Sequence, residues 1–280
     1  PRGSPRESAR RARRARCVAD MSSAGLSKGE RLLLKASQPN VAAEFPEALR
    51  VQRYLQFDTQ AYDLRAAATR LLGAAPDLGR FDDDDDDDGA RELERYQADD
   101  AIFRSFNTRQ RLRKCVCDDD AFLHVYKRLV IEVVLPWLKS HIEQQANVTG
   151  SLNFSYQYPP TLRVQPGRSR EFKRPHRDAE YGHQVGEVNF WMPLTNYTEM
   201  TQTTLWVESS PDLDDFQPLV VDYGDIAMFH GTLCRHHVPA NSSAFTRVSL
   251  DFRIGIEGFY DRDWQLDGVK GVHGRREFVL

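Results

Sequence analysis

Hydrophobic positions recur at helical spacing in the first half of this chain and form short runs in the second half. From residue 27 to about 128 the pattern is mainly helical, for example in 59–72 and from 90 onward. The clearest helix is predicted after the acidic cluster 118–120, because acids suit a helix N-terminus. Its apolar stripe is Phe122, Val125, Tyr126, Leu129, Val130, Val133 and Val134. The stripe indicates packing against a core and carries no information on chemistry.

After about residue 150 the pattern changes to β-branched and aromatic runs separated by Pro, Gly, Asn and Asp. We predict strands at 161–165, around 176–178, 187–194, 204–208, 218–222, 225–230, 235–238 and 246–254. Short antiparallel strands of this kind fit a double-stranded β-helix, the jelly-roll or cupin-like core in which two sheets enclose a pocket. The predicted fold is therefore mainly β with flanking helices (α+β), the helices packing outside one sheet.

Three regions are expected along the chain. Residues 1–26 are Arg-rich and lack apolar periodicity, which indicates a disordered leader or a transit peptide. Residues 27–145 form a helical region packed on the core, interrupted at 82–88 by seven consecutive aspartates that predict a solvated loop. Residues 146–280 form the jelly-roll core with a C-terminal extension.

Composition narrows the function classes. With 40% hydrophobic and 28% charged residues the chain is typical of a folded protein, and it has no apolar stretch long enough for a membrane span. A net charge of -3 gives no general attraction to nucleic acid. Four scattered cysteines do not form a disulfide framework, so we expect a cytoplasmic protein, or an organellar one if the leader is a transit peptide. A small-molecule substrate is the expected partner, and the oligomeric state is left open.

His176 and Asp178 form a His-X-Asp unit on a predicted strand. Because side chains alternate along a strand, the two residues are expected to point the same way and to share one metal ion. Alone the motif is weak, since a surface pair looks identical. A third ligand among His230, His236 and His237 would complete two histidines and one carboxylate on one face of the ion, as in non-haem iron(II) oxygenases.

The order His-X-Asp, His-X-Val-Pro-X-Asn and Arg-X-Ser over residues 150–255 resembles the 2-oxoglutarate-dependent oxygenases of the phytanoyl-CoA hydroxylase-like group. Within that group the chain is similar to StrG-like proteins associated with streptomycin biosynthesis. The segments that carry this resemblance are 176–183, 189–194, 205–209 and 235–237. The family pattern places the distal ligand five residues before Asn241 and eleven before Arg247, which selects His236. His237, on the opposite face of the same strand, is the alternative.

The resemblance also implies a site for the co-substrate. A guanidinium at Arg247 can fix the far carboxylate of 2-oxoglutarate with two parallel hydrogen bonds, and Ser249 faces the same pocket. The alternative is a buried Arg247 paired with a structural acid such as Asp251. Further candidates to line or approach the pocket are Asn189, Trp206, Glu187, Arg163 and Arg253, although a strand tryptophan is more typical of a core.

By resemblance, the activity is that of an iron(II), Fe(2+), dioxygenase that uses 2-oxoglutarate and O2, with ascorbate as a reductant, and releases succinate and CO2. Hydroxylation of a small polar molecule is expected, such as a sugar, an aminocyclitol or another natural-product intermediate, with Glu180 and Glu208 as candidates to meet amines. Asp178 favours hydroxylation over halogenation, because halogenating relatives leave that position to halide. A jelly-roll isomerase or hydrolase, or a non-catalytic metal-binding module, is the alternative.

Overall fold

The computed structural model describes residues 41, 43–81, 92–146, 150–170, 173–266 and 273–280 of the 280-residue sequence. Three predictions fall outside these residues: the leader 1–26, the start of the helical region at 27–40, and the acidic loop 82–88. Among the described helices, none has the length and apolar character needed to cross a membrane.

Two antiparallel sheets form the core, as the mainly β jelly-roll prediction requires. The larger sheet runs in the order β1 (Arg53–Gln56), β8 (Asp225–Phe229), β5 (Glu187–Pro193), β10 (Arg247–Ile256), β2 (Asn153–Gln157) and β11 (Arg275–Val279), with β3 (Thr161–Gln165) also paired to β10. The smaller sheet runs in the order β4 (Lys173–His176), β9 (His236–Val238), β6 (Trp206–Val207) and β7 (Gln217–Pro218). The predicted fold class is confirmed.

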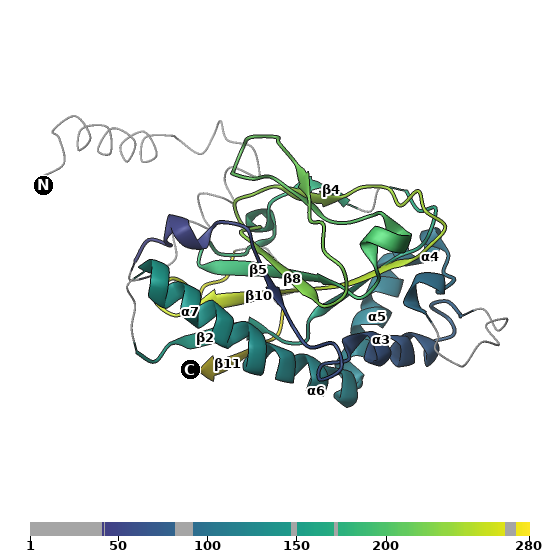
Figure 1. The fold of residues 1–280 in the computed structure, drawn as a ribbon, viewed down its shortest axis with the longest axis horizontal. Helices are drawn as coiled ribbons and strands as arrows, with labels where there is room; N and C mark the ends of the chain where they lie inside the picture. Colours follow the sequence, from purple (N-terminus) through teal and green to yellow (C-terminus); the bar gives the residue numbers. More distant parts are fainter. Residues whose placement is uncertain (1–40, 42, 82–91, 147–149, 171–172, 267–272) are drawn as a thin grey trace, which may run out of the picture.

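The helices cover the outer face of the larger sheet, where Figure 1 shows α6 and α7 lying along it, away from β4. They are α3 (Leu64–Gly73), α4 (Asp100–Arg104), α5 (Phe106–Asp118), α6 (Asp120–Leu129) and α7 (Leu135–Ala146), with a π-helical turn at Val130–Val134 joining the last two. Tyr126 of α6 packs edge-on against Phe252 with ring centroids 5.4 Å apart. The apolar stripe predicted from the sequence therefore faces the sheet, as expected.

Alternation along β10 divides its side chains between the helical layer and the space between the sheets. Five apolar residues face the helices and join the main core: Val248, Leu250, Phe252, Ile254 and Ile256. The residues of opposite parity are polar and face the smaller sheet: Arg247, Ser249, Asp251 and Arg253. A strand with one apolar and one polar face thus holds four polar groups on the inner side of the sheet.

Several elements differ from the sequence prediction. β1 lies inside the region expected to be helical and pairs with β8, and β2 and β11 were not predicted. The predicted strand around 176–178 ends at His176, and Asp178 begins a 3-10 helix, Asp178–Tyr181. The alternation argument was therefore wrong for Asp178, whose direction depends on the helical turn after the strand.

Candidate metal centre

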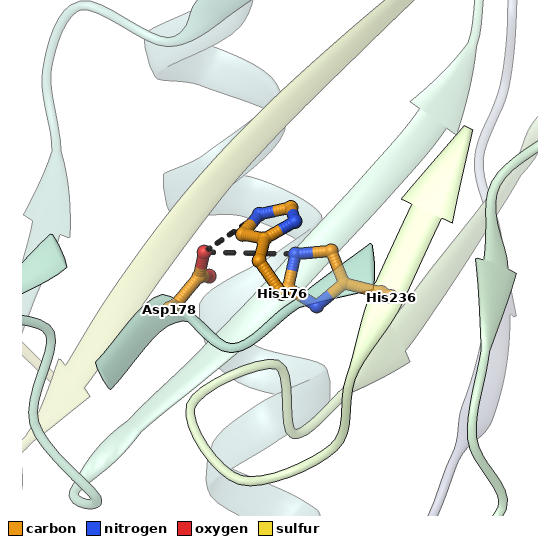
Figure 2. Close-up of side chains that lie close together, drawn as sticks. All are labelled: His176, Asp178 and His236. Atoms are coloured by element: carbon orange, nitrogen blue, oxygen red, sulfur yellow. Dashed lines mark ion pairs between the residues drawn. The ribbon is translucent and has the colours of Figure 1, made fainter. Parts of the chain in front are cut away.

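His176, Asp178 and His236 converge between the two sheets (Figure 2). β4 and β9 pair antiparallel with His176 directly opposite His236, so the two side chains leave neighbouring strands on one face. Asp178 reaches the same point from the 3-10 helix that follows β4. One ligand atom from each residue lies within 4.8 Å of the other two, and among the described residues no other group of three His, Cys, Asp or Glu side chains meets this condition.

Both histidines are oriented by hydrogen bonds of the ring nitrogen that faces away from the centre. Nδ1 of His176 lies 3.0 Å from the carbonyl oxygen of Arg174, and Nδ1 of His236 lies 3.2 Å from that of Cys234. A carbonyl only accepts, so each Nδ1 carries the proton and each Nε2 presents a lone pair. The two Nε2 atoms lie 3.8 and 3.6 Å from Oδ1 of Asp178. This donor set fits a divalent transition metal.

The second carboxylate oxygen of Asp178 is held from behind. Asn189 donates from Nδ2 to Oδ2 at 2.5 Å, while Nε and Nη2 of Arg253 lie 2.9 and 2.8 Å from the same atom. The Asn189 side chain also accepts from the backbone N–H of Gly231 at 3.1 Å. A Cβ on Gly231 would lie 2.8 Å from the Asn189 amide, so a larger residue at position 231 would displace this amide from Asp178. Oδ1 is left to face the histidines.

Electrostatics keep this carboxylate ionised. Asp178 is 2% exposed, and burial opposes its charge. The Arg253 guanidinium, followed by His236, outweighs burial and holds the pKa of Asp178 well below its usual range. An ionised carboxylate is the form that binds a metal.

A cavity of about 50 Å³ opens beside the three residues and leads to Arg247. Its apolar wall consists of Trp191, Leu205, Phe229 and Val238. Arg247 is 1% exposed, donates from Nε to Gln165 at 3.0 Å, and has Nη1 3.3 Å from Oγ of Ser249. Among the described residues no carboxylate oxygen lies within 4.0 Å of this guanidinium. The expected alternative of a structural acid paired with Arg247 is therefore not what the structure shows.

Asp251 pairs with a different arginine. Nε and Nη2 of Arg163 lie 3.1 and 2.8 Å from its two carboxylate oxygens. Burial opposes ionisation of Asp251, but the Arg163 charge lowers its pKa to about 2. Burial, together with Arg163, lowers the pKa of Arg247 to about 9, so its guanidinium stays charged at neutral pH without an anion of its own.

The other candidates from the sequence separate into two groups. Ser249 and Asn189 lie at the site, the first beside Arg247 and the second on Asp178. Trp206 does not line the cavity; Trp191 does, with its ring centroid 5.9 Å from Cζ of Arg247. Trp206 instead packs near His237, with ring centroids 6.3 Å apart.

The remaining histidines have other surroundings. His237 lines the cavity but points away from the three converging residues, and its ring meets Phe216 edge-on at 4.9 Å. His230 is buried, with Nε2 2.8 Å from the carbonyl oxygen of Val185. Of the three histidines that the sequence offered for the distal position, only His236 joins His176 and Asp178 in the described structure.

Sequence reasoning missed the role of Arg253. It was expected to line or approach the pocket, and the structure pairs it with Asp178. Arg253 and Arg247 lie an even number of positions apart on one strand, so the sequence could predict that both occupy the same face. It could not predict that Arg253 pairs with Asp178. Glu187, another inward-facing candidate, is buried against Arg275 and His183 at 2.6 and 3.1 Å.

Comparison with known proteins agrees with the predicted resemblance. No model of a known protein family matches the sequence. The streptomycin biosynthesis protein StrG of Streptomyces griseus is 36% identical over 102 residues, which are 36% of this chain and 47% of that protein. The match thus spans about half the length of the relative. The chain is similar to StrG over this segment.

Solved structures give weaker matches. The non-heme monooxygenase ThoJ in complex with Ni is 14% identical, with a TM-score of 0.43 over 89% of each chain. SnoK, a non-heme alpha-ketoglutarate-dependent carbocyclase from nogalamycin biosynthesis, is 16% identical, with a TM-score of 0.40 over 79% of this chain and 87% of that one. EctD from S. alaskensis is 15% identical, with a TM-score of 0.41 over 84% and 90%.

Proposed function

We propose that this chain is an iron(II)- and 2-oxoglutarate-dependent dioxygenase that hydroxylates a small polar molecule. His176, Asp178 and His236 would hold the metal through two Nε2 atoms and Oδ1. When bound, iron(II) supplies oxidation of a C–H bond by O2, coupled to conversion of 2-oxoglutarate to succinate and CO2. Three protein ligands on one face leave positions for exogenous ligands.

The observation that carries the proposal is the buried Arg247 guanidinium beside the candidate metal centre. An unpaired buried charge is costly, and proteins keep one where a ligand supplies the counter-charge. Its Nη1 and Nη2 groups form a fork that matches a carboxylate, and Ser249 Oγ, which accepts from Nη1, keeps its own proton to donate. A dicarboxylate with one end at the metal and the other at Arg247 fits this arrangement.

The cavity walls contribute by excluding water. Trp191 packs against Arg247, while Leu205 and Phe229 cover the space beside the histidines. In such surroundings the charge-assisted hydrogen bonds from Arg247 are stronger than they would be in water. Asn189 and Arg253 keep Asp178 in one orientation, so the metal ligands are positioned before any ligand arrives.

A jelly-roll isomerase, a hydrolase or a non-catalytic metal-binding module does not require a buried arginine that binds the carboxylate of a co-substrate. The position of Arg247 therefore favours the oxygenase over them. Asp178 supplies a carboxylate at the position that halogenation would need vacant, which favours hydroxylation.

The test is turnover of 2-oxoglutarate by the purified full-length protein. With iron(II), ascorbate and O2, the wild-type protein is expected to form succinate slowly even without substrate. The Asp178→Ala variant is the control, and folding of both is checked by circular dichroism. Succinate no faster than with Asp178→Ala, in a wild-type protein shown by calorimetry to bind Co(II), would disprove the oxygenase and leave a metal-binding module.

A further inference from the structure

A second cavity adjoins the first and shares Arg163 with it. It has a volume of about 120 Å³ and lies between α5 and β3, an edge strand that pairs with β10. We call it the α5 groove. Its apolar lining includes Phe103, Leu112, Pro159, Pro160 and Leu162. Arg163 lines both cavities, so this side chain borders the groove and the cavity beside the candidate metal centre.

The basic side chains of α5 fall into two classes. Arg111 forms an ion pair with Asp77, and Lys114 forms one with Asp118, and neither basic residue lines the groove. Arg109 and Arg113, one helical turn apart, do line it. Within the part of the chain that the structure describes, neither has a carboxylate oxygen within 4.0 Å. The charges that lack an acid partner are thus those that face the groove.

Among the described residues, no acidic side chain lines the groove. Asp251, which lines the first cavity, is held by Arg163. Glu208 is 2% exposed and accepts hydrogen bonds from the backbone and side chain of Arg235. Glu180 accepts from the backbone N–H of Arg177 at 3.0 Å. The two glutamates expected to meet substrate amines are therefore engaged within the protein.

We infer that the α5 groove binds the substrate, and that this substrate is an organic anion joining an apolar or ring portion to a phosphate or carboxylate group. Arg109 and Arg113 would bind the anionic group, the prolines and Leu112 the apolar portion, and the reacting end would lie past Arg163. The binding part of this inference stands on the groove alone. The assignment as substrate rests on the proposed oxygenase function.

The experiment measures binding of four related probes to the full-length, metal-free protein by isothermal titration calorimetry at low salt. Phenyl phosphate and 3-phenylpropionate test the two anionic groups, while 3-phenylpropanol and 3-phenylpropylamine are the neutral and cationic controls. At least one anion is expected to bind no less than tenfold tighter than both controls. The tighter anion identifies which acidic group the substrate carries.

Variants on one helix locate the binding. In the double variant Arg109→Gln/Arg113→Gln the anion should bind about tenfold more weakly, since charge-assisted hydrogen bonds are lost. Arg111→Gln removes a charge from the same helix outside the groove, and it should change the dissociation constant less than twofold. Equal weakening by Arg111→Gln, or equal binding of the alcohol or the amine, would overturn the inference.

The two proposals fail separately. If the anion binds as predicted but the wild-type protein forms no succinate above the Asp178→Ala control, the groove is an anion site and the oxygenase function is wrong. If succinate forms but neither anion binds better than the neutral probe, the oxygenase stands and the substrate class is wrong.

Discussion

Arg253 is ion-paired with Asp178, with Nε and Nη2 at 2.9 and 2.8 Å from the same oxygen, Oδ2. The pair is buried, with both side chains less than a tenth exposed. Because Arg253 and Asn189 engage Oδ2, Oδ1 is the atom turned toward His176 and His236. The orientation of the Asp178 carboxylate is therefore fixed by Arg253, which lies on β10, outside the His-X-Asp motif.

Replacing Arg253 by Gln should weaken metal binding without removing any ligand. Loss of a partner that orients a metal ligand typically costs about 10- to 100-fold in metal affinity. Calorimetric titration with Co(II) measures this change, and Arg276→Gln, at an exposed position on β11, is the matched control. Removing one partner of a buried ion pair should also lower the free energy of unfolding by about 3 kcal/mol. Unchanged Co(II) affinity would show that Asp178 does not need this partner.

Replacing Arg247 by Lys should weaken 2-oxoglutarate binding by about tenfold or more. Lysine keeps the charge but not the planar fork that binds a carboxylate through two parallel hydrogen bonds. Arg247→Gln, which removes the charge, should weaken it further. Titration of 2-oxoglutarate into Co(II)-loaded protein measures both, and Co(II) affinity itself should stay within about twofold in both variants. Equal loss of metal and 2-oxoglutarate binding would mean that Arg247 supports the fold rather than the co-substrate.

Acidification should destabilise the protein through His230. Burial lowers the pKa of His230 to about 4, against 6.5 in an unfolded chain, so the unfolded state binds more protons between these values. The free energy of unfolding therefore falls as the pH decreases through this window. From pH 6.5 to 5 the contribution of this histidine is about 1.6 kcal/mol, less than the full 1.36 kcal/mol per pH unit because the unfolded imidazole is only half protonated at pH 6.5.

Urea denaturation at several pH values measures this slope. The His230→Gln variant is less stable at neutral pH but should lose less stability between pH 6.5 and 5 than the wild type. His141, half-buried on α7, offers the control His141→Gln. The same slope in wild type and His230→Gln would contradict the assignment.

Replacing Glu208 by Gln should disturb the strand that carries His236. The two Glu208 oxygens accept from the backbone N–H of Arg235 at 2.7 Å, from its Nε at 3.0 Å and from the backbone N–H of Asp214 at 3.0 Å. A glutamine places an NH₂ group against at least one of these donors. We expect a loss of about 1 to 3 kcal/mol in the free energy of unfolding, measured by urea denaturation.

The control for this change is Glu143→Gln, which alters a surface ion pair with Lys139 and should cost less than about 1 kcal/mol. Because Glu208 holds the residue next to His236, Co(II) affinity should also fall in Glu208→Gln. If Glu208→Gln lost no more unfolding free energy than Glu143→Gln, the buried hydrogen bonds that Glu208 accepts would not contribute to stability.

Local pattern alone was sufficient for the features that depend on near neighbours in the chain. The period of two in 247–253 placed Arg247 and Ser249 on one face, and the stripe from Phe122 to Val134 identified the helix that packs on the sheet. The spacing that the family resemblance implies, to Asn241 and Arg247, selected His236 over His237, and in the described structure His236 lies with His176 and Asp178.

Tertiary structure decided which groups meet. Asp178 turns inward through a 3-10 helix, and its partner Arg253 is 75 positions away in the sequence, so no local period relates them. The same holds for Arg163, which pairs with Asp251 and leaves Arg247 without an acid. Strand pairing and burial set these choices, since in a water-poor interior each charge must be matched by whichever group the packing brings within reach.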